Sequence, residues 1–346
     1  MSMSPPESVS PSAGLSAAEI EVRLSRLAPA LAPGGLRATS LRRLTGGASL
    51  ETWAFDVEGE GAVAPLILRR REAVEESVFE TSLPLATEAV VLDAAGRAGV
   101  PVAGLARICT EDDGLGEAYV VQRVAGETLG RRIAAAPDFA PARAVLGRQC
   151  GQTLARIHGL DAAALPSLET MDATAVIDRY VDIYRKGEAK RPVIEAAIRW
   201  MRDRIPAPVQ ARPLHGDFRN GNLMIDPATG LVAVLDWELA HLGDPAEDLG
   251  WLCVNSWRFG VTEKAVGGFA DLDDLLAGYR EAGGEPPSAE RVRFWQAVGS
   301  FKWAVVALMM YRSFATGESA SVERAVIGRR ISECEVDLLA LMEASR

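Results

Sequence analysis

The stretch LHGDFRNGNLMIDPATGLVAVLDW, residues 214–237, decides the expected fold of this chain. Its first part is too rich in Gly and Asn for the interior of a helix, and two apolar runs separated by the turn sequence PATG follow it. Apolar runs joined by such a turn are typical of a β-hairpin. If the hairpin folds back on itself, Asn222 lies beside Asp236, and Asp217 precedes the asparagine by five positions.

These three side chains suit phosphoryl transfer. Mg²⁺ prefers hard oxygen ligands and leaves several of its positions to phosphate and water, so we expect Asn222 and Asp236 to bind it. Asp217 is then available to accept a proton from an attacking hydroxyl group. An Asp followed five positions later by an Asn is also the spacing of the phosphoryl-transfer template. We expect His215 to support this loop through backbone hydrogen bonds. An HGD tripeptide alone is common in turns, so the prediction depends on several motifs occurring in order.

The sequence around this stretch changes from strand-like to helix-like segments. Antiparallel strands are indicated by short or alternating apolar segments beside tight loops: LRRLTGGASLETWAFDV at 41–57, APLILRR at 64–70 and AYVVQRV at 118–124. Beyond them, apolar residues recur at the three- and four-residue spacing of amphipathic helices. We therefore predict an α+β protein with three parts: a disordered tail at 1–14, a small antiparallel β lobe at 15–124, and a larger helical lobe at 125–346 with the β-hairpin embedded in it.

Composition excludes several classes of protein. The chain has 346 residues, of which 48% are hydrophobic and 24% charged, and this balance can bury a core rather than stay disordered. Its net charge of −10 provides no basic surface for a nucleic acid backbone, so no nucleic acid partner is expected. The most apolar stretch of the C-terminal part is interrupted by Lys302 and Arg312, which leaves it too short to span a membrane.

The cysteines and the N-terminus indicate a cytoplasmic protein. The cysteines lie far apart and form no CxxC pair, so we expect buried, reduced thiols at Cys109, Cys150, Cys253 and Cys334. The first fourteen residues are rich in Ser and Pro and lack the basic and apolar regions of a secretory signal. Nothing in the sequence indicates an oligomeric state.

The motifs HGDFRNGN, VLDWE and GDPAEDLGW together resemble those of the aminoglycoside phosphotransferase-like branch of the protein-kinase-like fold. The resemblance extends from about Leu41 to the last helix, and it is strongest to the kinase-like domain fused to some acyl-CoA dehydrogenases. It implies a two-lobed fold in which Asp217 is the catalytic base. It also implies that Asn222 and Asp236 hold Mg²⁺, and that Asp248 is a buried carboxylate that braces the catalytic loop.

The same resemblance implies a site for the nucleotide phosphates. The segment LTGGASLETW corresponds to the phosphate-covering hairpin, and small residues let backbone N–H groups approach the anion. The expected phosphate contacts there are Gly46, Gly47 and Ser49.

A cation is also implied beside the phosphates. Arg69 stands where the family's phosphate-binding Lys is expected, with Glu88 as its expected partner on a helix. Because a guanidinium binds phosphate through a planar fork, this replacement is not neutral. The strand YVVQRVAG resembles the hinge that reads adenine through backbone groups, which implies contacts from Gln122 and Val124.

These expectations describe an ATP- and Mg²⁺-dependent kinase that phosphorylates a hydroxyl group of a small molecule. A hydroxyacyl thioester of coenzyme A is one candidate acceptor, by analogy with the dehydrogenase-fused relatives, and a hydroxylated lipid or a sugar stays open. The C-terminal part has no acidic block to bind a cationic aminoglycoside, so the family name alone does not imply antibiotic resistance.

Two alternatives to a kinase follow from other features. One is a non-catalytic nucleotide-binding pseudokinase, for which Arg69 in place of Lys is the only support in the sequence. The other is a scaffold protein built on the C-terminal helices, which would leave the intact catalytic set unexplained.

Overall fold

The computed structural model describes residues 15–44, 50–59, 61–71, 82–187, 190–318 and 321–344, so the predicted tail at 1–14 lies outside the described residues. Contacts within the chain divide it into two compact units. The N-terminal unit comprises Met1–Ala89 and Gly104–Arg123, and the C-terminal unit comprises Val90–Ala103 and Val124–Arg346. The first contains a small antiparallel sheet and the second is mainly helical, which confirms the predicted α+β class.

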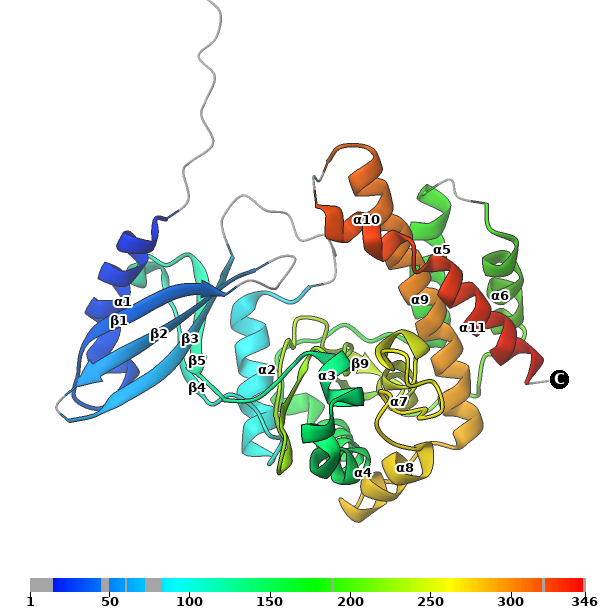
Figure 1. Cartoon of the computed structure of the whole chain (residues 1–346), viewed down its shortest axis with the longest axis horizontal. Helices are drawn as coiled ribbons and strands as arrows, with labels where there is room; N and C mark the ends of the chain where they lie inside the picture. Colours follow the sequence, from blue (N-terminus) through cyan, green and yellow to red (C-terminus); the bar gives the residue numbers. More distant parts are fainter. Residues whose placement is uncertain are drawn as a thin grey trace, which may run out of the picture. The chain divides into compact units, whose positions relative to one another are not determined.

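The N-terminal unit is built on a five-stranded antiparallel sheet with the strand order β1-β2-β3-β5-β4 (Figure 1). Its strands are β1 (Gly35–Leu44), β2 (Glu51–Gly59), β3 (Val63–Arg71), β4 (Leu105–Ile108) and β5 (Glu117–Gln122). Strands β2, β3 and β5 overlap segments that the sequence predicts as strands. Strand β1 begins at Gly35, before the predicted segment at 41–57, and β4 has only the four residues LARI, which are too few to show an alternating pattern.

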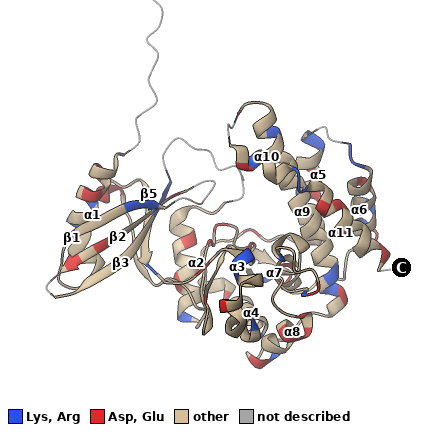
Figure 2. Ribbon diagram, in the orientation of Figure 1, with Lys and Arg blue, Asp and Glu red and all other residues tan. Residues whose placement is uncertain are grey.

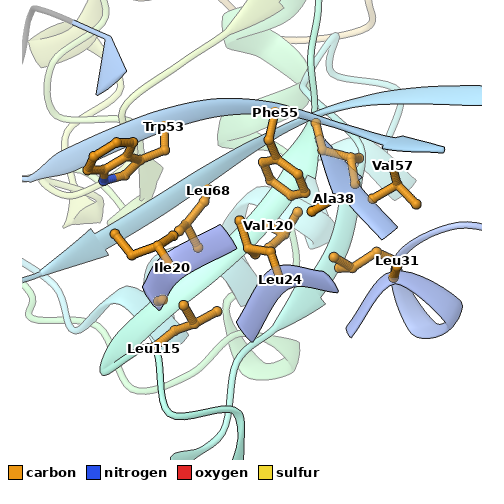
Figure 3. Packing of buried hydrophobic residues seen from close by; sticks show 13 residues of the cluster. Ile20, Leu24, Leu31, Ala38, Trp53, Phe55, Val57, Leu68, Leu115 and Val120 are labelled. Carbon is orange, nitrogen blue, oxygen red and sulfur yellow. The ribbon is translucent and has the colours of Figure 1, made fainter. Parts of the chain in front are cut away.

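Helix α1 (Ala17–Leu31) packs against this sheet. The hydroxyl of Ser16 accepts a hydrogen bond from the backbone of Glu19 at 3.3 Å, and the Glu19 carboxylate accepts one from the backbone of Ser16 at 2.8 Å. This capping box satisfies N–H groups that have no partner inside the helix. Figure 3 shows the buried residues of α1 with those of the strands: Ile20, Leu24 and Leu31 beside Phe55, Val57, Leu68 and Val120. Their burial supplies the apolar core of this unit.

The C-terminal unit is assembled around one long helix, α9 (Ala289–Ala315), which packs against α5, α6, α7, α10 and α11 (Figure 1). A further pair, α4 and α8, packs together within the same unit. The remaining helices are α2 (Leu85–Arg97), which begins in the N-terminal unit, α3 (Gly130–Ala135), α4 (Ala140–His158), α5 (Ala173–Lys186), α6 (Pro192–Arg202), α7 (Ala246–Leu252), α8 (Leu272–Glu281), α10 (Val322–Gly328) and α11 (Ile331–Glu343).

The predicted hairpin is present in the C-terminal unit as β7 (Leu223–Asp226) and β8 (Gly230–Val234). A second antiparallel pair joins β6 (Arg212–Leu214) to β9 (His241–Gly243). These strands have three residues each, so no sequence period reveals them. Their pairing brings together the two ends of the segment that carries the three predicted oxygen ligands.

Several surface and core properties can be compared with the predictions from composition. Cys150, Cys253 and Cys334 are buried free thiols as expected, whereas Cys109 is only partly buried. Basic and acidic residues are interspersed along the ribbon (Figure 2). Among the described residues, no helix is long and apolar enough to cross a membrane.

Candidate active site

One buried carboxylate holds the HGD loop, which we define as residues 215–222. The side chain of Asp248 in α7 accepts hydrogen bonds from the backbone N–H groups of Gly216 at 2.9 Å and His215 at 2.8 Å. Gly216 has a φ of +79°, and a Cβ there would lie 2.2 Å from the carbonyl oxygen of Leu239. Only glycine fits this turn. The expectation that Asp248 is buried and braces the loop is confirmed by these contacts.

Two further buried side chains support Asp248. The Nε2 atom of His158 lies 3.2 Å from Asp248 Oδ2, and its Nδ1 atom lies 3.0 Å from the Tyr279 hydroxyl. Burial raises the pKa of Tyr279 to about 12, so this hydroxyl keeps its proton at neutral pH. Burial on its own raises the pKa of Asp248, but the hydrogen bonds from His158 and the backbone outweigh it and hold that pKa below its usual value. Asp248 is therefore an ionised acceptor inside the unit.

His215 supports the loop as a neutral ring, which confirms its predicted role. Its Nδ1 atom accepts a hydrogen bond from the backbone N–H of Asp217 at 3.1 Å. The proton must then reside on Nε2, which donates to the carbonyl oxygen of Leu235 at 3.0 Å. Burial lowers the pKa of His215, in agreement with the neutral form.

Three donors orient the carboxylate of Asp217. Its Oδ1 atom accepts hydrogen bonds from Trp251 Nε1 at 2.7 Å and from Arg219 Nε at 2.9 Å. Its Oδ2 atom accepts one from Asn222 Nδ2 at 2.6 Å. A carboxylate oxygen has two lone pairs. Both of those on Oδ1 are therefore in use, whereas Oδ2 has one donor among the described residues and keeps a lone pair for a further hydrogen bond.

Asn222 and Asp236 lie at the same end of the hairpin, as the sequence predicts. The backbone N–H of Leu235 donates to the carbonyl oxygen of Asn222 at 2.8 Å, and Asp236 follows directly. Asp236 has a φ of +65°, a left-handed conformation that is uncommon outside glycine and that accumulates at functional sites.

The orientation of the Asn222 amide matters for metal binding. Its Nδ2 atom donates both to the main-chain oxygen of Asp217 at 3.0 Å and to Oδ2 of the same residue at 2.6 Å. The opposite orientation would place two oxygen acceptors against each other, so the amide oxygen is the atom left for a cation. Together with the Asp236 carboxylate it forms a set of hard donors that suits Mg²⁺. Among the described residues, no group of three or more His, Cys, Asp and Glu side chains could hold a metal ion.

The N-terminal unit contains the predicted pair of Arg69 and Glu88. Nη1 of Arg69 lies 3.2 Å from Oε1 of the fully buried Glu88, which confirms the pairing. The same carboxylate oxygen accepts a hydrogen bond from the Tyr119 hydroxyl at 2.9 Å, and the guanidinium lies 5.8 Å from the centre of the Tyr119 ring. Glu88 and Tyr119 thus hold the arginine side chain in one orientation.

The other predicted nucleotide contacts fall in two places. Gly46, Gly47 and Ser49 lie outside the described residues. Gln122 is the last residue of β5 and is exposed, and Val124 follows the strand. The chain passes from the N-terminal to the C-terminal unit between residues 123 and 124.

Sequence reasoning missed three residues around Asp217. Arg219 and Trp251 both donate to its carboxylate, and Lys302 of α9 donates to the carbonyl oxygen of the preceding residue, Gly216, at 3.2 Å. Arg219 and Trp251 stand inside quoted motifs, but nothing in the sequence shows which way they point. Lys302 could have been noticed in the sequence, because it is a charged residue within an otherwise apolar helical stretch.

Comparison with known proteins gives a family match. Residues 40–294 match the model of the phosphotransferase enzyme family. Mouse acyl-CoA dehydrogenase family member 10 is 27% identical over 274 residues, which are 74% of this chain and 25% of that protein. The Arabidopsis thaliana protein named probable acyl-CoA dehydrogenase IBR3 is 26% identical over 311 residues, which are 81% of this chain and 37% of that protein. The chain therefore spans well under half the length of these relatives.

Solved structures share the fold at low sequence identity. A Ralstonia eutropha protein assigned as an aminoglycoside phosphotransferase has a TM-score of 0.70 at 22% identity, with 93% of this chain and 98% of that chain covered. Spectinomycin phosphotransferase, solved with ADP and spectinomycin, has a TM-score of 0.62 at 11% identity, with 88% of this chain and 94% of that chain covered. The protein-kinase-like fold expected from the motifs is thereby confirmed.

Proposed function

Because the chain belongs to the phosphotransferase enzyme family, we propose that it is a kinase that transfers the terminal phosphoryl group of Mg·ATP to a hydroxyl group of a small metabolite. The observation that carries this proposal is the arrangement at Asp217. One oxygen of its carboxylate is saturated by Trp251 and Arg219, and the other keeps a lone pair beside Asn222. That lone pair can accept the hydrogen bond of an incoming hydroxyl.

In this proposal Asp217 orients the acceptor hydroxyl and takes its proton as the oxygen attacks phosphorus. The fixed donors keep the carboxylate from turning away, so its free lone pair points in one direction before the acceptor arrives. Catalysis by such a site depends mostly on positioning and on charge stabilisation. The HGD loop therefore has to be rigid, and its bonds to Asp248 provide that rigidity.

Magnesium fits the donor set of this site. The amide oxygen of Asn222 and the carboxylate of Asp236 would hold it, with phosphate oxygens and water as the other ligands. When bound, the ion neutralises charge on the transferred phosphoryl group. In the N-terminal unit, Arg69 is the proposed phosphate-binding cation, and Glu88 and Tyr119 orient it. Gly46, Gly47 and Ser49 are the proposed phosphate contacts, and Gln122 and Val124 the proposed adenine contacts.

A hydroxyacyl thioester of coenzyme A, or another hydroxylated metabolite, is the proposed acceptor. Support comes from the relatives named as acyl-CoA dehydrogenases, of which this chain matches only a part. The spectinomycin complex concerns a protein that is 11% identical, and it provides no reason to propose an antibiotic as the acceptor here.

The test is an assay of hydroxylated metabolites for Mg·ATP-dependent phosphorylated products by mass spectrometry. The variant Asp217→Asn is expected to lower kcat by about 10²- to 10⁴-fold while nucleotide binding survives. Asp236→Asn is expected to lose the Mg²⁺-dependent part of nucleotide binding. Asp226→Asn is a matched control, because Asp226 lies on the same hairpin and its carboxylate accepts hydrogen bonds from the turn residues Ala228 and Thr229.

The same assay separates the kinase from a pseudokinase. Tight nucleotide binding by the wild-type protein without turnover on any acceptor would favour the pseudokinase. Equal activity of Asp217→Asn and wild type would rule out the proposed role of Asp217.

A further inference from the structure

Lys302 occupies an unusual position in the long helix α9. Its Nζ atom donates a hydrogen bond to the carbonyl oxygen of Gly216 at 3.2 Å, in the turn directly before Asp217. The same atom lies 4.7 Å from the ring centre of Trp251 and 5.7 Å from that of Tyr180. The proposed chemistry at Asp217 makes no use of this ammonium group.

The ammonium group has more hydrogen-bonding capacity than its neighbours use. It carries three N–H donors, and the Gly216 carbonyl takes one of them. The two aromatic rings attract the charge but provide no oxygen acceptor. Lys302 forms no ion pair with a carboxylate of any residue that the structure describes. Among the described residues, the Gly216 carbonyl is therefore the oxygen acceptor of this ammonium group, and its other two donors have no oxygen partner.

The group is charged at neutral pH. Burial on its own lowers the pKa of Lys302, but its interactions with Tyr180 and with the carboxylates of Glu247, Asp217 and Asp248 outweigh burial and hold that pKa above its ordinary value. The side chain as a whole is partly buried.

Trp251 connects Lys302 to Asp217. Its indole N–H donates to Asp217 Oδ1 at 2.7 Å, while the face of the same ring lies against the ammonium of Lys302. Gly299 makes this contact possible, because a Cβ there would lie 2.9 Å from Cε3 of Trp251. The packing of α7 on α9 thus places a cation and the proposed catalytic carboxylate on one indole ring.

A second cation is held in the same manner. The guanidinium of Arg219, which bonds to Asp217, lies 4.5 Å from the ring centre of Trp257. The rings of Trp251 and Trp257 are 5.1 Å apart. Both positive side chains beside Asp217 therefore rest on tryptophans.

We propose that Lys302 is a specificity-determining residue that binds an anionic oxygen group of the acceptor, and this inference rests on the kinase function proposed above. The group is a carboxylate or a phosphate that lies on the same molecule as the reacting hydroxyl. A free hydroxy acid supplies the first and a coenzyme A thioester supplies the second. Binding of the anion to Lys302 brings the hydroxyl to the free lone pair of Asp217.

The experiment compares three acceptors: 3-hydroxybutyrate, 3-hydroxybutyryl coenzyme A and the neutral 1,3-butanediol. Binding is followed by tryptophan fluorescence, because Trp251 lies at the site, and phosphoryl transfer is followed by mass spectrometry. The wild type is expected to prefer at least one anionic probe over the diol by about 10- to 100-fold, as charge-assisted hydrogen bonds are worth this much. The preferred probe shows whether the anionic group is the carboxylate of a hydroxy acid or a phosphate of coenzyme A.

Variants separate recognition from a structural role. Lys302→Met is expected to raise KM for the preferred anion by about 10- to 100-fold, to leave that for the diol within about threefold, and to change kcat little. Lys302→Arg is expected to restore most of the preference. Lys264→Met is the matched control, because Lys264 forms an exposed ion pair with Asp271 at 2.7 Å. Thermal unfolding of each variant shows that it is folded.

Several outcomes overturn the assignment. Wild-type protein that shows no preference for an anion, including one that binds none of the probes, contradicts it. A Lys302→Met variant that loses kcat equally on every acceptor indicates a structural role instead. A structural role is also indicated if Lys302→Met does not fold and Lys302→Arg shows no preference for the anionic acceptor. A wild type that binds the anion preferentially but transfers no phosphoryl group supports the anion site and counts against the kinase function.

Discussion

Two buried carboxylates, Asp248 in the C-terminal unit and Glu88 in the N-terminal unit, have different kinds of partner. Asp248 accepts hydrogen bonds from two consecutive backbone N–H groups and from His158. Glu88 contacts two side chains, the Arg69 guanidinium and the Tyr119 hydroxyl. The first carboxylate therefore determines the path of the main chain, and the second determines the direction of one side chain.

This difference indicates which part of the site tolerates change. The backbone N–H groups of a turn held by a carboxylate can only donate hydrogen bonds. They therefore need an acceptor at the position of the carboxylate, and a donor cannot replace it. A side-chain cation can be exchanged for another cation that keeps its charge, although Arg and Lys bind phosphate with different geometry. The same chemical change, carboxylate to carboxamide, should thus have unequal effects in the two units.

The largest effect is expected for Asp248→Asn. One carboxylate oxygen becomes an NH₂ group and faces an N–H donor, so a buried donor loses its acceptor. We expect a loss of about 3 kcal/mol in the free energy of unfolding, together with strongly reduced kinase activity. Urea denaturation measures the first quantity. A loss below that of the Glu88 variant would contradict the comparison.

A smaller effect is expected for Glu88→Gln. The amide oxygen can still accept the Tyr119 hydroxyl, but the ion pair with Arg69 is lost. We expect a loss of about 1–2 kcal/mol in stability and a rise of about tenfold in KM for ATP. Steady-state kinetics at varied ATP measures the rise. Arg69→Lys is the companion variant and should keep KM within a few-fold of wild type, whereas Arg69→Met should not.

The capping box of α1 provides a reference in the N-terminal unit that lies outside the proposed site. Ser16→Ala removes the acceptor for the backbone N–H of Glu19. The expected loss is about 1 kcal/mol in the free energy of unfolding, with KM and kcat unchanged. Ser16→Asp restores a capping acceptor and should recover most of the stability. A change in KM for ATP in either variant would show that stability and nucleotide binding cannot be separated in this unit.

The smallest effect is expected for the dependence of the free energy of unfolding on pH. It is small because His215 and His241 change this free energy in opposite directions as the pH falls. Burial lowers the pKa of His215 below 6.5, so its contribution is present above pH 6.5 and is lost as the pH falls through the lowered value. For His241, burial acts to lower the pKa but Glu247 raises it above 6.5, so its contribution is present below pH 6.5 and is lost as the pH rises through the raised value.

The variant His241→Gln tests this opposition. This variant removes the contribution of His241 to stability, which increases as the pH falls. The free energy of unfolding of the variant should therefore fall more steeply than that of the wild type between pH 7.5 and 5.5. Urea denaturation at several pH values gives both slopes. An equal slope in the two proteins would show that His241 does not oppose His215.

Much of the site could be predicted because its reactive side chains lie close together in the sequence. A loop of Gly and Asn followed by a hairpin has few conformations, so Asn222 and Asp236 had to meet if the hairpin formed. The pairing of Arg69 with Glu88 and the role of Asp248 followed from resemblance, and the contacts confirm both. The short strands β4, β6 and β9 could not be predicted, because three or four residues carry no period.

The sequence by itself determined the class of fold, the loop and hairpin, and the three oxygen-bearing side chains at Asp217, Asn222 and Asp236. Only the tertiary structure decided which atoms remain available. The packing of α7 on α9 brings Trp251 and Lys302 to the HGD loop, and it leaves one lone pair on Asp217 and two donors on Lys302. The reason is physical: spacing along a chain limits which neighbours can meet, whereas the direction of a side chain depends on packing against residues distant in sequence.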